Sequence, residues 1–131
     1  MGRRTADSRR RANRFGRIAE AICRWRLRLS GWRILASDWR VPAGEIDIVA
    51  RRGKVVAFVE VKARSGGTAE TAAPAPRQRA RIARAGEMFL AQHPEFGTLF
   101  GRFDVMLVQP WPSPRFLWPI HIPDAWRPES R

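Results

Sequence analysis

Three charged residues, Asp47, Glu60 and Lys62, stand at corresponding ends of two predicted β-strands and could together carry out chemistry. Two carboxylates that converge can bind one divalent cation, because Mg²⁺ and Mn²⁺ prefer hard oxygen ligands. A lysine beside such a pair can offset part of its negative charge. We therefore predict a metal site at these residues. The alternative is that they form the solvated face of an ordinary hairpin.

A β-hairpin must position these side chains. In residues 45–50, Ile46, Ile48 and Ala50 alternate with Glu45, Asp47 and Val49. Residues 55–62 form an apolar run that ends in Glu60 and Lys62. Both patterns predict strands, and the second is typical of a central strand of a sheet. Gly53 can take the positive φ of a tight turn, so we predict a two-residue loop at Arg52-Gly53.

This register predicts that Asp47, Glu60 and Lys62 share one face of the hairpin. Asp47 would face Phe58 and lie diagonal to Glu60, roughly 7–8 Å away at the backbone. The other face would carry aliphatic side chains, namely Ile46, Ile48, Val59 and Val61. Without a cation, two carboxylates this close should repel and raise each other's pKa. Such a cost within a central strand favours a functional site over a solvated face.

These residues also carry a resemblance. Asp47 followed by Glu60-Val61-Lys62 fits the D-x(n)-E-x-K signature of the PD-(D/E)xK nuclease superfamily. Three longer strings are more specific: Gly44-Glu45-Ile46-Asp47, Phe58-Val59-Glu60-Val61-Lys62-Ala63-Arg64 and Arg102-Phe103-Asp104-Val105. From residue 15 to residue 126 the chain resembles the YraN family, small bacterial proteins predicted to be endonucleases distantly related to archaeal Holliday-junction resolvases.

The resemblance implies an α/β, restriction-endonuclease-like fold, with a mixed central β-sheet flanked by helices. It also implies a Mg²⁺- or Mn²⁺-dependent endonuclease that hydrolyses phosphodiester bonds of structured or branched DNA. Asp47 and Glu60 would be metal ligands, the Val61 carbonyl a further ligand, and Lys62 the partner of the attacking water or of the transition-state charge. One alternative is a nucleic-acid-binding module without catalysis. Another is an interaction protein whose basic surface meets ribosomal RNA or an acidic partner.

A first helix is predicted from Phe15 to about Leu29, with Ser30-Gly31 ending it. Its predicted buried stripe consists of Phe15, Ile18, Ala19, Ile22, Trp25 and Leu29. Glu20 lies on a neighbouring stripe, between the small residues Gly16 and Cys23, and could approach the acidic face of the hairpin. By resemblance to a G-x-x-G-E pattern, kept here except for Ala19, Glu20 is a further metal-site acid. An exposed helix glutamate is the alternative.

A second helix is predicted to begin at about Pro76, because proline suits the first turn. Its N-terminal half carries the positive end of the helix dipole and the arginines that best suit phosphate binding: Arg77, Arg79, Arg81 and Arg84. Gln78 matches a glutamine of the family, which implies that it helps to order the site. Arg40 and Arg64 are further candidates for nucleic-acid binding, although Arg40 could equally be an ordinary surface arginine.

Three more strands complete the prediction, over Trp32–Trp39, Phe103–Val108 and Phe116–Ile122, the last interrupted by Pro119 and so at an edge. Asp104 is predicted to be structural, bonded to Arg102 or to a helix terminus. His121 is predicted to pack or to form a hydrogen bond, since a lone histidine makes no metal site. His93 is predicted to cap the second helix or to face solvent.

Length and charge set the broad class. The 131 residues fit one domain, predicted as residues 15–131 after a basic, disordered arm at residues 1–14. A net charge of +13 favours a polyanionic partner, which we expect to be nucleic acid, most specifically DNA with branched or irregular structure. No apolar run spans a membrane, so we expect a cytoplasmic protein and no membrane partner. Related resolvases are symmetric dimers, which leaves a homodimer open.

Overall fold

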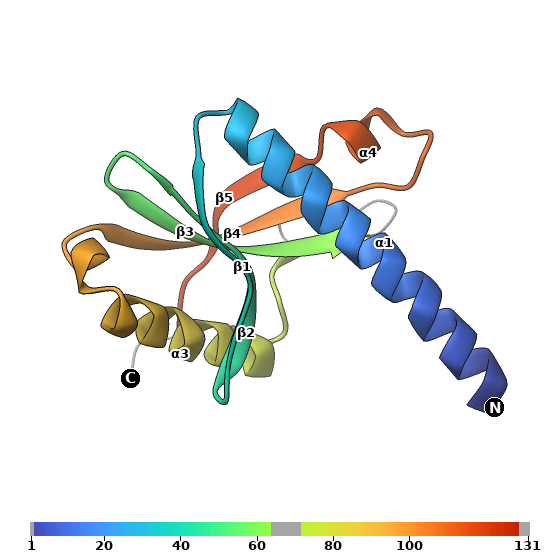
Figure 1. The fold of residues 1–131 in the computed structure, drawn as a ribbon, viewed down its shortest axis with the longest axis horizontal. Helices are drawn as coiled ribbons and strands as arrows, with labels where there is room; N and C mark the ends of the chain where they lie inside the picture. The colour runs from blue at the N-terminus through green and yellow to red at the C-terminus, as the bar shows by residue number, and fades with distance from the viewer. Residues whose placement is uncertain (1, 64–71, 129–131) are drawn as a thin grey trace.

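The computed structural model describes residues 2–63 and 72–128, with side chains from Gly16 onward (Figure 1). The elements are α1 (Gly2–Leu29), β1 (Arg33–Val41), β2 (Gly44–Arg52), β3 (Val55–Ala63), α3 (Pro76–Gln92), η1 (Pro94–Phe96), β4 (Phe100–Val108), α4 (Pro114–Leu117) and β5 (Ile120–Trp126). The predicted start of the second helix at Pro76 is confirmed.

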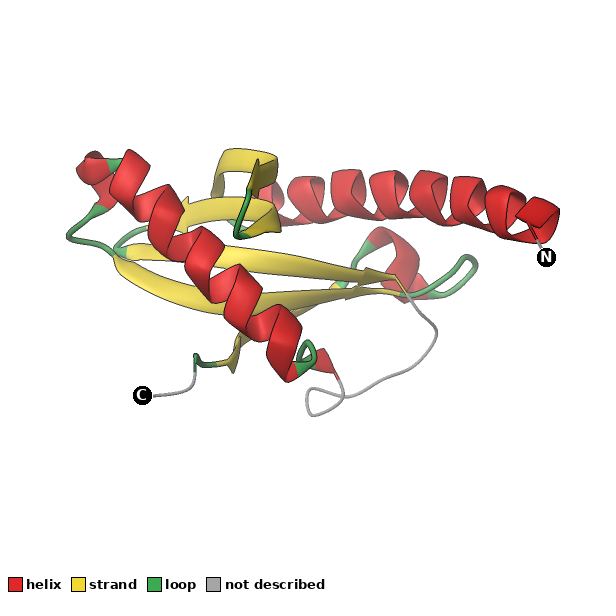
Figure 2. Ribbon diagram, turned by 90° about the horizontal axis from the view of Figure 1, so that it is seen from below, coloured by secondary structure: helices red, strands yellow, loops and turns green. Residues whose placement is uncertain are grey.

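The five strands form one mixed sheet in the order β1-β2-β3-β4-β5. Neighbouring strands are antiparallel except β3 and β4, which are parallel and therefore need a crossover, here supplied by α3. Helices cover both faces of the sheet, as Figure 2 shows from below. The predicted α/β fold with a mixed central sheet is confirmed, and this architecture is consistent with a restriction-endonuclease-like fold.

Each face of the sheet has its own apolar core, because successive strand residues point to opposite sides. On one face, Ile82, Ala85 and Phe89 of α3 pack on residues such as Val49, Val56, Phe58, Val105 and Leu107. On the other face, Ala19, Cys23 and Leu27 of α1 pack on residues such as Ile48, Ala50, Ala57, Val59, Met106 and Val108. The hairpin β2–β3 is thus buried on both sides.

The hairpin register differs from the prediction by two residues. Arg52 pairs with Val55, so the two-residue loop is Gly53-Lys54 and not Arg52-Gly53. Gly53 has φ +60° and takes the first central position, which suits glycine in a hairpin turn. A shift of two preserves the side to which each residue points, so the alternation of faces survives while the residues that stand opposite one another change.

The buried stripe of α1 also differs from the prediction. Ala19, Cys23 and Leu27 face the sheet, whereas Ile18, Trp25 and Leu29 are exposed; the side chain of Phe15 lies outside the described residues. Small residues let the helix approach the sheet closely, which the bulkier stripe would prevent. Burial raises the pKa of the Cys23 thiol to about 12, so this side chain is a neutral core residue.

The structure differs at both ends of the chain as well. Helix α1 starts at Gly2, within the segment predicted to be a disordered arm, and its N-terminal half projects past the sheet (Figures 1 and 2). Arginine and alanine are good helix formers, which favours this extension. The last strand starts at Ile120, not Phe116, because Ser113 caps the short helix α4 by accepting a hydrogen bond from the Arg115 N–H. Strand β5 lies at the sheet edge, as predicted.

Candidate active site

Asp47 and Glu60 stand one residue beyond the last backbone pair between β2 and β3, which is Ile48 with Val59. There the Asp47 side chain contacts β3 directly, because its Oδ2 accepts a hydrogen bond from the Val61 N–H at 2.8 Å. The strand that carries Glu60 and Lys62 therefore also fixes the carboxylate of Asp47. Val61 contributes its N–H to this arrangement.

The two carboxylates line one small pocket between the strands and α3. Its volume is about 30 Å³, roughly that of one water molecule, and its walls are Glu45, Ile46, Asp47, Val59, Glu60, Gln78 and Ile82. Ile46 and Ile48 were predicted to share one face of the hairpin, and this was wrong. Ile46 belongs to the core beneath α3, whereas Ile48 belongs to the core beneath α1. Strand β2 turns where its ladder with β3 ends.

One oxygen of Glu60 is held by two neighbours. Gln78 Nε2 donates a hydrogen bond to Glu60 Oε1 at 2.8 Å, and Lys62 Nζ lies 3.7 Å from the same oxygen. The other oxygen, Oε2, is buried and has no hydrogen-bond partner among the described residues. The structure thus brings Asp47, Glu60, Lys62 and Gln78 together, with one carboxylate oxygen left without a donor.

The pKa values of both carboxyl groups are raised. Burial is the main cause for Asp47, and Glu45 and Asp38 add repulsion, against the Val61 N–H and Lys62, which lower the pKa. Burial is also the main cause for Glu60, where repulsion from Asp47 raises the pKa and Lys62 and Gln78 lower it. Each group is therefore less stable as an anion here than in water, which is the expected state of metal ligands without their cation.

Glu20 of α1 lies close enough to interact electrostatically with Asp47. Burial raises its pKa, and repulsion from Asp47 is the next cause, with Arg24 acting in the opposite direction. However, the described residues contain no group of three or more His, Cys, Asp or Glu side chains placed to hold a metal ion. Glu20 is thus near the acidic pair without joining it as a third ligand.

The predicted phosphate-binding arginines are placed unequally. Arg77 and Arg81 line an open pocket of about 340 Å³ that adjoins the carboxylate pocket through Glu45, Gln78 and Ile82. Arg79 is half-buried on the same helix. Arg40 forms ion pairs with Asp38 at 3.2 Å and with Glu45 at 3.3 Å, so its charge is already partly offset. Arg64 lies outside the described residues.

Gly44 sets the distance between α3 and the site, a role that the sequence prediction did not include. A Cβ atom at this position would lie 2.7 Å from the Arg81 carbonyl oxygen, closer than such contacts allow. The side chain of Arg81 also reaches back, and its Nε donates to the Ala43 carbonyl at 3.4 Å. The absence of a side chain at Gly44 lets the arginine-bearing turn of α3 approach β2, and the glycine that precedes Glu45 was the available signal.

Comparison with known proteins shows the family of this chain. The sequence model of the uncharacterised protein family UPF0102, which corresponds to the YraN family, matches residues 19–108. The chain belongs to this family. A UPF0102 protein of Paramagnetospirillum magneticum is 46% identical over 120 residues, covering 88% of this chain and 89% of the relative. A UPF0102 protein of Parvibaculum lavamentivorans is 47% identical over 117 residues, covering 89% and 84%.

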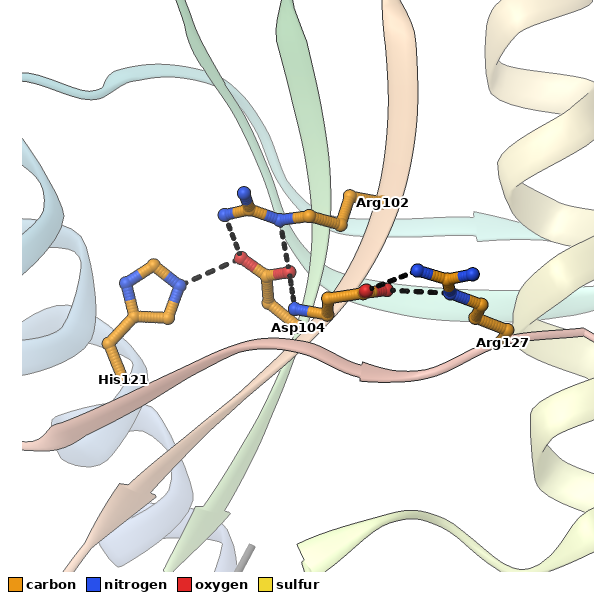
Figure 3. A network of polar contacts seen from close by, with 5 residues as sticks. Arg102, Asp104, His121 and Arg127 are labelled. Atoms are coloured by element: carbon orange, nitrogen blue, oxygen red, sulfur yellow. Dashed lines mark hydrogen bonds and ion pairs between the residues drawn. The ribbon is translucent and has the colours of Figure 1, made fainter.

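The UPF0102 match includes a second buried acid, Asp104, which forms a closed network (Figure 3). Arg102 donates to both of its oxygens at 2.8 and 2.9 Å, His121 Nε2 lies 2.8 Å from Oδ2, and the Asp124 N–H donates to Oδ1 at 2.9 Å. The predicted structural role of Asp104, its bond to Arg102 and the hydrogen-bonding role of His121 are confirmed. His93 caps α3, as predicted.

Proposed function

We propose that this UPF0102 protein is a metal-dependent endonuclease that hydrolyses phosphodiester bonds of structured or branched DNA in the cytoplasm. One observation carries the proposal: Glu60 lines the same small pocket as Asp47, and one of its carboxylate oxygens is buried without a hydrogen-bond donor among the described residues. A buried carboxylate oxygen without a donor costs free energy, and a divalent cation would offset that cost. The preference for branched DNA rests on the resemblance to resolvases.

The residues present fit Mg²⁺ or Mn²⁺. Asp47 and Glu60 supply hard oxygen donors, the Val61 carbonyl is a candidate third ligand, and the raised pKa values of both acids indicate that positive charge would stabilise their ionised forms. A bound cation would supply a Lewis acid to the phosphate and would acidify a coordinated water. Glu20 is placed to influence the charge of the pair rather than to complete it.

The remaining residues of the site would bind and orient the DNA. Lys62 lies beside Glu60, where its charged ammonium could stabilise charge that develops on the phosphate. Only in its neutral amine form could it instead accept a proton from the attacking water. Gln78 fixes Glu60 by its hydrogen bond to Oε1, which keeps Oε2 directed away from it. Arg77 and Arg81 border the adjoining pocket and would contact flanking phosphates.

A cleavage assay tests the proposal. Purified protein would be incubated with linear, flapped and four-way DNA in the presence of Mg²⁺, Mn²⁺ or a chelator. We expect metal-dependent cutting of a branched substrate by wild type and by the control Glu95→Gln, which removes an exposed acid from η1. Asp47→Asn should abolish cutting. Equal cutting by Asp47→Asn, or cutting in chelator, would overturn the metal-dependent reading.

A second candidate, a nucleic-acid-binding module without catalysis, is favoured by one observation. Glu45, Asp47 and Glu60 all line the pocket, but no three acids of the described residues are placed to hold the same ion. This candidate predicts salt-sensitive DNA binding by wild type, no cutting of any substrate, and no change in thermal stability on addition of Mn²⁺. Those three results together would replace the nuclease proposal.

A further inference from the structure

The outward side of α1 is apolar. Ile18, Trp25 and Leu29 are 50%, 63% and 70% exposed, although their spacing of seven and four residues places them on one stripe of the helix. The helix binds the sheet through a different stripe, Ala19, Cys23 and Leu27. Amphipathic helices normally bury their bulkiest apolar stripe, so α1 has one apolar stripe more than the fold uses.

Two further exposed apolar residues lie on α4 and directly after it, and α4 contacts α1. Leu117 is 63% exposed and Trp118 is 44% exposed. Arg26 ties the two elements together, because its guanidinium lies 4.5 Å from the centre of the Trp118 ring and its Nε donates to the Pro119 carbonyl at 3.1 Å. We call Ile18, Trp25, Leu29, Leu117 and Trp118 the outer surface. Single exposed apolar residues are ordinary, but five on two touching elements indicate an interaction surface.

Exposed arginines border this outer surface among the described residues. Arg17 and Arg28 are exposed on α1, Arg28 lies 5.9 Å from the centre of the Trp25 ring, and Arg115 is exposed on α4. In the part of α1 whose side chains are described, Glu20 is the single acid. Repulsion from Asp47 helps to raise the pKa of Glu20, so this acid interacts with the active-site carboxylates. A partner must therefore offer apolar contact and negative charge at the same time.

This requirement discriminates among partners. A second copy would offer apolar side chains, but symmetric pairing of α1 would bring arginines against arginines on a chain of net charge +13. Duplex DNA offers phosphates, but its apolar base faces are stacked inside the helix. An anionic lipid bilayer offers both, since tryptophan and leucine enter the boundary between headgroups and acyl chains while arginine heads remain at the phosphates.

We propose that the outer surface binds the surface of an anionic lipid membrane. Within the described residues no helix is long and apolar enough to cross a bilayer, and an interfacial helix does not need to cross one. The sequence predicted no membrane partner because no apolar run is long enough to span a bilayer, and it separately assigned Ile18, Trp25 and Leu29 to the buried stripe. The inference is independent of the proposed nuclease activity, because the outer surface includes none of the site residues.

Vesicle flotation tests the inference. The full chain should float with vesicles that contain phosphatidylglycerol and remain unbound with pure phosphatidylcholine, and added salt should weaken the binding. Trp25→Ser combined with Leu29→Ser should weaken it by at least about tenfold, since binding scales with the apolar area inserted. Phe100→Ser, which removes an equally exposed aromatic ring from β4, is the matched control and should bind like wild type. Circular dichroism would verify that both variants fold.

The other partners give distinct results. Equal flotation of the double variant, equal binding to phosphatidylcholine, or no binding to any vesicle would overturn the proposal, and the last result would leave an acidic, apolar protein as the partner. A dimer in size-exclusion chromatography that the double variant converts to monomer would assign the surface to a second copy. A tenfold loss of duplex DNA affinity would assign it to DNA. Because Trp25 and Leu29 are outside the site, DNA cleavage by the double variant should equal that of wild type.

Discussion

Asp104 and Glu60 lie on neighbouring strands, are both largely buried, and differ in their hydrogen-bond donors. Asp104 is fully buried, and burial alone would raise its pKa, but donors from His121, Arg102 and the Asp124 backbone lower the pKa below its usual value. Glu60 has a side chain that is 12% exposed, one oxygen without a donor, and a raised pKa. Donor supply, more than burial, separates a carboxylate that stabilises the fold from one that is available to a cation.

The largest effect is expected from removing the charge of Asp104. Asp104→Asn should lower the free energy of unfolding by about 3 kcal/mol, because it leaves Arg102 beside a neutral, buried group. Urea denaturation would measure the change. Asp124→Asn is the control: it removes an exposed charge at a left-handed position that asparagine tolerates, and little change is expected. Equal effects of the two substitutions would contradict the structural role of Asp104.

Removal of the Glu60 charge should have the opposite effect on stability. Glu60→Gln relieves repulsion at Asp47, so the protein without metal should be as stable as wild type or more stable. The rise in melting temperature caused by Mn²⁺ should disappear, and cleavage should fall by more than about 100-fold. Differential scanning fluorimetry with and without Mn²⁺ measures the first two effects. A Mn²⁺-dependent rise that persists in Glu60→Gln would show that this acid is no ligand.

Lys62 should separate metal binding from chemistry. Lys62→Ala leaves both carboxylates in place, so the Mn²⁺-dependent rise in melting temperature should remain while cleavage falls by about 100-fold. The comparison with Glu60→Gln is direct, because the two residues are neighbours on one strand face. If Lys62→Ala also loses the response to Mn²⁺, the lysine supports the arrangement of the acids instead of the reaction.

The smallest effect concerns pH. A carboxyl group with a raised pKa binds protons more tightly in the folded protein, so its contribution to stability falls as pH rises through that pKa. Without metal, the melting-temperature advantage of an Asp47→Asn, Glu60→Gln double variant over wild type should therefore grow from pH 4 towards pH 7. Asp104, with a lowered pKa, contributes stability that is lost only as pH falls below about 4. A constant difference between the proteins across this range would contradict the raised pKa values.

The sequence alone determined which residues could form the site. Alternation in residues 45–62 placed Asp47 and Glu60 on related strand positions, and Pro76 marked the start of the helix that brings Gln78 to Glu60. These signals are local, because the period of a strand and the fixed φ of proline depend only on neighbouring residues. The sequence also assigned structural roles to Asp104 and His121, but only the structure showed that the two side chains contact each other.

The tertiary structure chose between alternatives that local sequence patterns permit equally. Gly53 fits either central position of a tight turn, so only the packed sheet selected the register that places Asp47 beyond the last pair and against Val61. Two stripes of α1 are apolar, and the stripe with the smaller side chains packs on the sheet, because Ala19 and Cys23 allow a close approach. Alternation fixes the side on which a residue lies only within a ladder, as Ile46 beyond the last β2–β3 pair shows, and it does not fix the opposite neighbour. Helical periodicity fixes a stripe but not whether the core or another surface covers it.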